Sequence, residues 1–117
     1  MATFSKLVPS GSTNGKGIKI AAVATPGTTF HTAVAGVTSF DEVWMYLYNG
    51  DVVARIVTIE FGGVTVPDNN IILTIQPKSG VICAVPGLVL NNANVIAAFA
   101  DAANVVTMTG FVNRMAI

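Results

Sequence analysis

The chain has 117 residues, of which 52% are hydrophobic and 10% are charged, and its formal net charge is +0. Its few lysines and arginines form no basic patch for nucleic acid, and its apolar runs are too short to span a bilayer. A domain of this size buries only about 60–70% of the surface that its unfolded chain exposes. We therefore expect some apolar surface to remain for a partner.

The first segment, residues 1–15, is expected to be an N-terminal arm followed by a polar, glycine-rich tether. Phe4, Leu7 and Val8 make the arm apolar, so we expect it to contact another chain. The segment has no basic region followed by an apolar stretch, which would mark a secretory signal. Residues 16–117 are expected to form a single domain.

Short runs of β-branched and aromatic residues, divided by turn residues, predict about eight strands in this domain. In chain order the runs are 17–24, 28–34, 42–48, 52–61, 71–76, 81–85 with 88–90, 95–100 and 105–114. A spacing of about 8–12 residues is typical of all-β sandwiches and barrels. The predicted fold is therefore an antiparallel β-sandwich, jelly-roll-like or Ig-like, with little helix.

Three local patterns refine this prediction. Asn49-Gly50 predicts a tight type I′ hairpin between the third and fourth runs. The third run is apolar at consecutive positions, Val43 to Tyr48, which predicts that both of its faces are covered, one of them by another chain. Residues 97–103 have a helical composition, but their β-branched flanks favour a strand followed by a turn.

Candidate chemical groups are few. His31 is the only histidine, and a position on a strand face is expected for it. Cys83 lies in an apolar run, which predicts a buried, inert thiol. Asp41 and Glu42 could act as a general acid and base only in a cleft, and strand-edge solubility or a cap explains them better. We expect no catalytic residue, no cofactor and no metal.

Two groups of residues are candidates for an interface. Trp44, Tyr46 and Tyr48 recur with period two, so they share one face of a strand, which suits a carbohydrate platform or, as we expect, core or subunit packing. Phe111 and Arg114 lie near the C-terminal end, and arginine beside aromatic residues is enriched at interfaces. We expect Arg114 to bind a carboxylate or carbonyl of a neighbouring chain.

Stretches of the second half carry a resemblance to a known class of proteins. These stretches are Phe61-Gly62-Gly63, Ile71 to Gln76, Pro77-Lys78-Ser79-Gly80, Val85-Pro86-Gly87-Leu88-Val89-Leu90 and Thr109-Gly110-Phe111-Val112-Asn113-Arg114. They resemble small structural proteins of tailed-bacteriophage virions, of the capsid cement or decoration type. The resemblance implies a β-sandwich that binds a capsid lattice, often as a trimer, and strengthens the shell without catalysis or cofactor.

Under this hypothesis the partners are the major capsid protein or other virion proteins, together with further copies of the chain. The protein would be made in the host cytoplasm and become part of the virion. The residues leave two alternatives open. One is a carbohydrate-binding or host-attachment module that uses the Trp44 face, and the other is a small jelly-roll enzyme.

Overall fold

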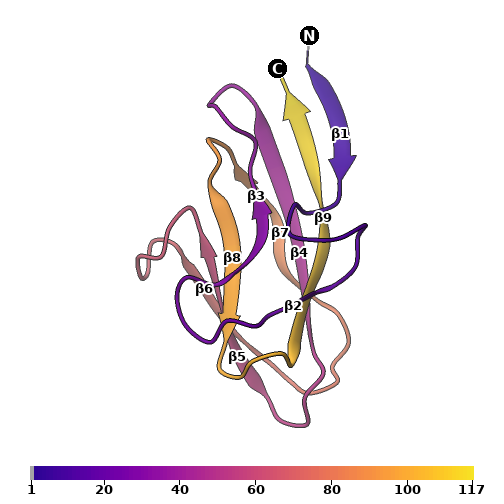
Figure 1. Ribbon diagram of the computed structural model, residues 1–117, viewed down its shortest axis with the longest axis vertical. Coiled ribbons are helices and arrows are strands. Elements are labelled where there is room, and N and C mark those ends of the chain that lie inside the picture. The colour runs from indigo at the N-terminus through magenta and orange to yellow at the C-terminus, as the bar shows by residue number, and fades with distance from the viewer. Residues whose placement is uncertain (1) are drawn as a thin grey trace.

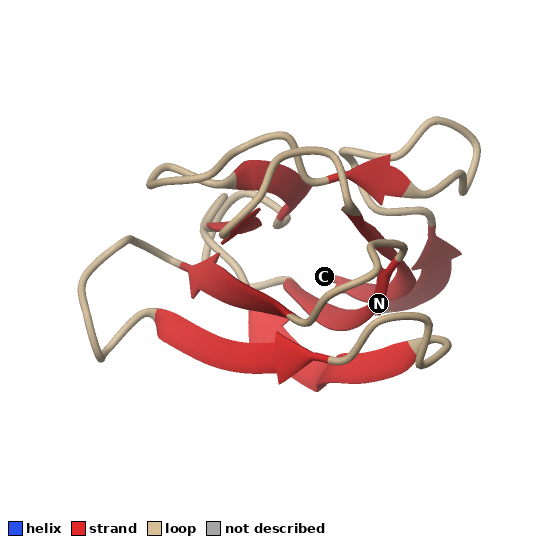
Figure 2. Cartoon of the chain, turned by 90° about the horizontal axis from the view of Figure 1, so that it is seen from below, coloured by secondary structure: helices blue, strands red, loops and turns tan. Residues whose placement is uncertain are grey.

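The computed structural model describes residues 2–117, which form nine strands and no helix. The strands are β1 (Thr3–Leu7), β2 (Ile18–Lys19), β3 (Thr28–Thr32), β4 (Phe40–Asn49), β5 (Arg55–Phe61), β6 (Asn70–Ile75), β7 (Ile82–Leu90), β8 (Val95–Ala100) and β9 (Val106–Ala116). They form two antiparallel sheets, seen as two layers in Figure 2. The predicted all-β sandwich is confirmed. The described part of the chain contains no helical segment that could cross a membrane.

The first sheet has the strand order β1-β9-β4-β7, and β2 pairs with β9 beyond the end of β1. The second sheet has the order β3-β8-β5-β6. β4 and β9 pair along ten residues and run most of the length of the molecule (Figure 1). Neighbouring strands are mostly distant in sequence, so the sandwich is held together by long-range contacts.

The core lies between the two sheets and follows from strict alternation along the strands. On β4, Val43, Met45 and Leu47 point inward and are completely buried. They meet Val57 and Ile59 of β5, which are equally buried. A strand with one face on the core buries alternate residues, and the intervening residues of β4 therefore point away from the core.

The predicted type I′ hairpin at Asn49-Gly50 is wrong. β4 belongs to the first sheet and β5 to the second, so the chain crosses between the layers here. The reason is the buried Asn49 side chain, whose Nδ2 donates to the carbonyl oxygens of Val53 at 2.9 Å and Ile75 at 3.0 Å. Its Oδ1 accepts from the N–H of Asp51. These bonds fix a corner instead of a hairpin.

The Pro86-Gly87 pair, expected to divide two short strands, lies inside the single strand β7. β7 is an edge strand of the first sheet, where a proline can sit without removing a hydrogen bond from a central ladder. The pairing of β7 with β4 shifts register between Val43 and Trp44, opposite this pair. The proline and glycine are therefore accommodated by an irregularity in the pairing.

The N-terminal segment is an edge strand of the first sheet. Residues 3–7 form β1, which pairs with β9 from Thr3 to Leu7. Leu7 packs against the core of its own chain. Phe4 is 78% exposed and Val8 is 51% exposed, so these two apolar side chains remain available. Contact of this segment with another chain stays a prediction.

Candidate functional site

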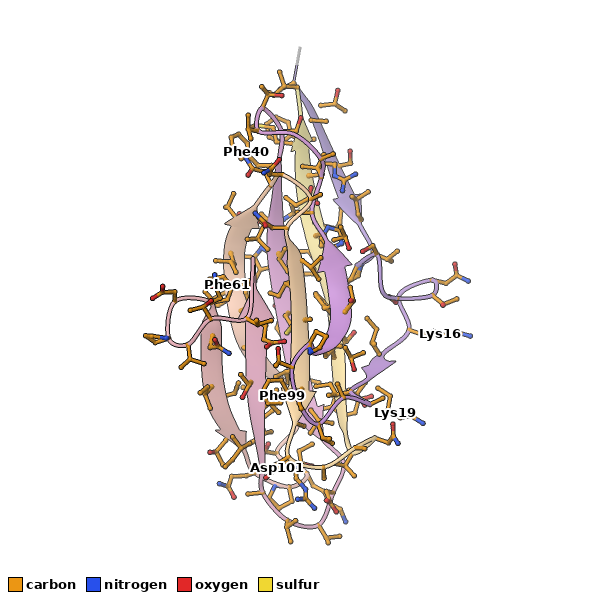
Figure 3. All side chains as sticks on the ribbon, turned by 60° about the vertical axis from the view of Figure 1, so that its left-hand side comes forward. Lys16, Lys19, Phe40, Phe61, Phe99 and Asp101 are labelled. Carbon is orange, nitrogen blue, oxygen red and sulfur yellow. The ribbon has the colours of Figure 1, made fainter. Side chains whose placement is uncertain are left out.

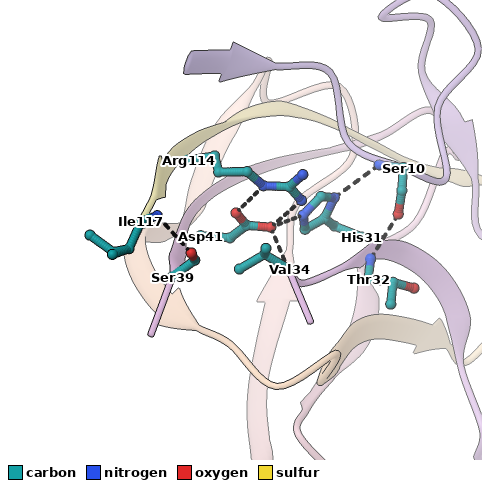
Figure 4. Close-up of polar contacts among 8 residues, drawn as sticks. All are labelled: Ser10, His31, Thr32, Val34, Ser39, Asp41, Arg114 and Ile117. Atoms are coloured by element: carbon teal, nitrogen blue, oxygen red, sulfur yellow. Dashed lines mark hydrogen bonds and ion pairs between the residues drawn. The ribbon is translucent and has the colours of Figure 1, made fainter. Parts of the chain in front are cut away.

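A polar cluster joins the two sheets near the chain termini (Figure 4). Its centre is Asp41 of β4, which is completely buried and pairs across the ladder with Arg114 of β9. The Asp41 carboxylate accepts from Arg114 Nε at 2.7 Å and Nη2 at 2.9 Å. It also accepts from the N–H of Val34 at 3.0 Å and lies 2.7 Å from Nε2 of His31, which belongs to β3 of the second sheet.

The hydrogen bonds of His31 define its tautomer. The N–H of Ser10 donates to Nδ1 at 3.0 Å, so Nδ1 must be unprotonated, and Nε2 carries the hydrogen that is donated to Asp41. Ser10 Oγ in turn accepts from the N–H of Thr32 at 2.7 Å. Both ring nitrogens are occupied and the side chain is buried. The imidazole therefore has no free nitrogen with which to accept a proton from a substrate.

The partners of Asp41 determine its ionisation. Burial by itself would raise the pKa of this carboxyl, but the hydrogen bonds from Arg114 and His31, the Arg114 charge and the Val34 N–H together lower the pKa below its usual value. The same hydrogen bond to Asp41 raises the pKa of Arg114. Asp41 and Arg114 are therefore a charged pair, and this pair is part of the scaffold.

Other acidic side chains also bind groups of their own chain. Glu60 is buried and accepts from Thr25 Oγ1 at 2.6 Å and from the N–H of Gly27 at 2.8 Å, which holds the loop before β3 against the second sheet. Asp51 accepts from Arg55 at 2.6 Å. Residues 2–117 contain no group of three or more His, Cys, Asp or Glu side chains that could hold a metal ion.

The outer face of the first sheet carries a row of stacked side chains. The rings of Trp44 and Phe111 are stacked, with centroids 5.8 Å apart and planes inclined by 10°. The ammonium of Lys6 lies 4.8 Å from the Phe111 centroid on β9. On the other side, Gly87 lies so close to Trp44 that an added Cβ would be 3.3 Å from the indole. The row thus runs across all four long strands of the sheet.

Glu42 lies next to the stacked Trp44 and Phe111 side chains. Its Oε1 accepts from Trp44 Nε1 at 2.7 Å and from Asn113 Nδ2 at 3.0 Å. The bond from Trp44, followed by that from Asn113, lowers the pKa of Glu42. The side chain is therefore held in one orientation as a carboxylate at neutral pH.

A shallow groove of about 470 Å³ lies on the same face, toward the end of the molecule where Phe40 is found (Figure 3). Its apolar lining comes from four strands and consists of Phe4, Phe40, Val89 and Met115. Its charged lining consists of two cations, Lys6 and Arg114, and one anion, Glu42. Because Arg114 is paired with Asp41, the lining charges that form no ion pair within residues 2–117 are those of Lys6 and Glu42.

The candidate residues from the sequence are distributed over both sides of the first sheet. Trp44, Tyr46 and Tyr48 lie together on its outer face, and Phe111 joins them. Arg114 instead points inward, and the carboxylate that it binds is Asp41 of its own chain. Leu7 is part of the core, whereas Phe4 and Val8 are exposed, as described above.

The Asp41 cluster was not predicted from the sequence. The sequence did contain one indication of it. Asp41 is separated from Val43 and Met45 by even numbers of positions along β4, so it lies on the same, buried face of the strand. A carboxylate at a buried position requires a partner. Nothing in the sequence identified that partner as Arg114 or His31, which lie 73 and 10 residues away.

The prediction that Cys83 is buried is wrong, because its side chain is exposed. Alternation along β7 turns Ile82 and Ala84 toward the core and leaves Cys83 on the outer face, opposite Tyr46. The apolar neighbours in the sequence therefore do not indicate burial of the residue between them.

No family model matches the chain, and no curated protein matches it. A similar solved structure is an exo-β-1,3-galactanase from Phanerochaete chrysosporium, an E208A variant with β-1,3-galactotriose, at 23% sequence identity and a TM-score of 0.46. The match covers 97% of this chain and 26% of that chain, so the protein spans about a quarter of its length.

Proposed function

We propose that the protein is a non-enzymatic structural subunit of a bacteriophage virion that cements neighbouring subunits of the capsid. The proposal combines the resemblance of the second half of the sequence with the distribution of apolar surface on the folded chain. The partner would be the major capsid protein or another protein of the particle.

The observation that carries the proposal is exposed apolar side chains at both ends of an elongated molecule. The longest dimension is 49 Å, and the termini lie together at one end of it (Figure 1). At that end, Phe4, Val89 and Ile117 are more than half exposed. At the other end, the loop after β4 exposes Val52 and Val53. A molecule with an apolar surface at each end can contact two neighbours at once.

Binding through both ends strengthens attachment even when each contact is weak. Each apolar contact contributes about 25 cal/mol per Å² removed from water, before the cost of association is subtracted. When one end is bound, the other end is held close to its target, so its binding becomes effectively intramolecular. A lattice repeats this arrangement many times, which suits a protein that strengthens seams between subunits.

The internal bonding of the titratable groups supports a non-enzymatic role. His31 has both nitrogens occupied, Asp41 is paired with Arg114, and Glu60 binds its own loop. A general acid or base needs a lone pair or proton that a substrate can reach. These groups serve the fold, and the energetic contribution to binding would come from apolar contacts.

The carbohydrate-binding alternative requires an aromatic ring that presents a face to a sugar. Phe111 stacks on the indole of Trp44 and the backbone of Gly87 lies close to its six-membered ring, so the indole is only partly exposed to a sugar. The structure thus offers less support for a sugar platform than for protein contact. A glycan array probed with the purified protein tests this alternative, with the Trp44→Ala variant as the control.

The cement proposal is tested on particles from a phage that carries this gene. We expect the protein to be a stoichiometric component of purified virions, and heads that lack it to release their DNA at a lower temperature. Adding the purified protein back should restore the release temperature. Absence of the protein from purified virions, or unchanged heat stability of heads without it, would contradict the proposal.

A further inference from the structure

On the outer face of the first sheet, side chains of β1 and β4 are arranged in rows about β9. β1 and β4 flank the C-terminal part of this strand, so its outward residues Asn113 and Met115 each have one neighbour on either side. Met115 lies between Phe4 and Phe40, which gives an apolar row. The next outward residue, Asn113, lies between Lys6 and Glu42, which gives a row of cation, amide and anion.

We propose that this face binds a second copy of the chain, with a two-fold axis that runs parallel to β9 between the two sheets. Such a rotation places β1 of each copy over β4 of the other. Phe4 then faces the partner's Phe40, and Lys6 faces the partner's Glu42. Each contact occurs twice, as an isologous interface requires.

The charges favour a second copy over any other occupant. Within residues 2–117, neither Lys6 nor Glu42 forms an ion pair. Trp44 and Asn113 hold the Glu42 carboxylate in place, and Lys6 is positioned over Phe111. A partner must therefore offer an anion and a cation at the same spacing but in the opposite order. A rotated copy of the same face provides this arrangement.

The apolar row fits the same partner. Phe4 is 78% exposed, and the groove between it and Val89 has a volume of about 470 Å³. Two sheets that pack face to face lie about 10 Å apart, a distance that side chains from the two sheets fill together. Phe4 of each copy would enter the groove of the other and lie against Phe40. This inference concerns contact between copies and does not depend on a virion role.

Charge reversal tests the interface directly. We expect the wild-type chain to sediment as a dimer in the micromolar range. Lys6→Glu and Glu42→Lys should each weaken the dimer by about a hundredfold or more, because each places like charges opposite one another twice. An equimolar mixture of the two variants should form a dimer again, because one variant then presents two carboxylates and the other two ammonium groups.

Three controls separate association from folding. Lys16→Glu changes the same charge on the loop between β1 and β2, far from Phe40 (Figure 3), and should leave the dimer intact. Circular dichroism and thermal melting should show that both charge variants are folded. Should Glu42→Lys fail to fold, Phe4→Asp provides the second test, since it should also give a monomer while remaining folded.

Several outcomes would overturn the inference. They are a wild-type monomer throughout the micromolar range, a trimer, or a dimer that both charge variants retain. A mixture of the two variants that remains monomeric would do the same. Because none of these measurements involves virions, failure of the dimer is distinguishable from failure of the cement proposal.

Discussion

Asp41 is a carboxylate without access to water, and the groups that stabilise its charge come from both sheets. Arg114 reaches it from β9, and His31 reaches it from β3. His31 also accepts from the N–H of Ser10, so the cluster fixes the chain where it leaves β1. Removing Arg114 or His31 takes a partner from the buried Asp41 carboxylate, which costs more than the bond itself.

We expect Arg114→Ala to lower the free energy of unfolding by about 3 kcal/mol, because it removes two of the bonds to a buried charge. For His31→Ala we expect a cost of about 2 kcal/mol, since the Ser10 N–H and Asp41 each lose a partner. Urea denaturation measures the free energy of unfolding of both variants. Lys16→Ala is the control and should change this free energy by less than about 0.5 kcal/mol. Values equal to that control would contradict the role of the cluster.

The lowered pKa of Asp41 makes the stability depend on pH. A carboxyl with a lower pKa in the folded state stabilises the fold above its unfolded pKa and loses this contribution as the pH falls through the folded pKa. We expect the free energy of unfolding to decrease below about pH 4. In the Asp41→Asn variant the free energy of unfolding should decrease less at acid pH. Asp101→Asn is the control, because it changes an exposed carboxylate, and its decrease should match that of the wild type. Urea curves recorded across the acid range test this difference.

At the scale of the strands, β9 organises the first sheet, since it pairs with β1, β2 and β4. Gly110 lies in the middle of β9 with a φ of +148°. A Cβ at this position would overlap the carbonyl oxygen of Trp44 on β4. The glycine therefore permits the close approach of these two central strands, which no other residue would allow without a shift of the backbone.

Gly110→Ala is expected to destabilise the protein by more than about 3 kcal/mol, because it adds this overlap to the cost of an unfavourable φ. Gly36 provides a matched control, since its φ is +81° but an added Cβ would meet no atom within 4 Å. Gly36→Ala should therefore cost only about 1–2 kcal/mol. Thermal melting of both variants measures the difference, and equal costs would rule out the contact with Trp44 as the cause.

Strands were predictable from the sequence where alternation and residue type agree. Val95 to Ala100 is a strand as expected, despite the alanine-rich composition that continues beyond it. The corner at Asn49 was not predictable, because it depends on hydrogen bonds to Val53 and Ile75 that only the folded sandwich provides. A turn signal specifies local backbone preferences, whereas the choice between a hairpin and a crossing is made by tertiary contacts.

In the candidate site, too, some features could be predicted from the sequence and others could not. The shared outer face of Trp44, Tyr46 and Tyr48 followed from period two alone. The stacking of Trp44 on Phe111 depends on the register between β4 and β9, which are distant in sequence. The internal pairing of Arg114 depends on that register as well. Register between distant strands is set by the whole fold and cannot be obtained from one sequence.

The whole molecule is an elongated sandwich with few charges and an apolar surface at each end. Under the cement proposal, both ends must bind for a seam to be strengthened. A protein with one functional end would still bind a particle, but it would not join two subunits. Binding and stabilisation are therefore separable properties.

The double variant Val52→Asp/Val53→Asp tests this separation. We expect it to remain folded, since both side chains lie in an exposed loop. It should still bind heads that lack the protein, through the end near the termini, but it should no longer raise their DNA-release temperature. Binding is measured by co-sedimentation with the heads and release by a DNA-binding dye. Full stabilisation by this variant would show that the loop after β4 is not required.

The direction of β4 has a mechanical consequence. This strand begins with Phe40 at the end near the termini and finishes at Asn49 beside the opposite loop, so a load between the two ends would act along it. Hydrogen bonds of an antiparallel ladder run perpendicular to the strands, and a pull along β4 therefore loads its bonds to β7 and β9 together in shear. A pull across the sheet, such as one that separates Thr3 from β9, would break the β1 pairs one at a time. Under the cement proposal, the same sheet would resist an expanding shell along its length and yield readily at its N-terminal edge.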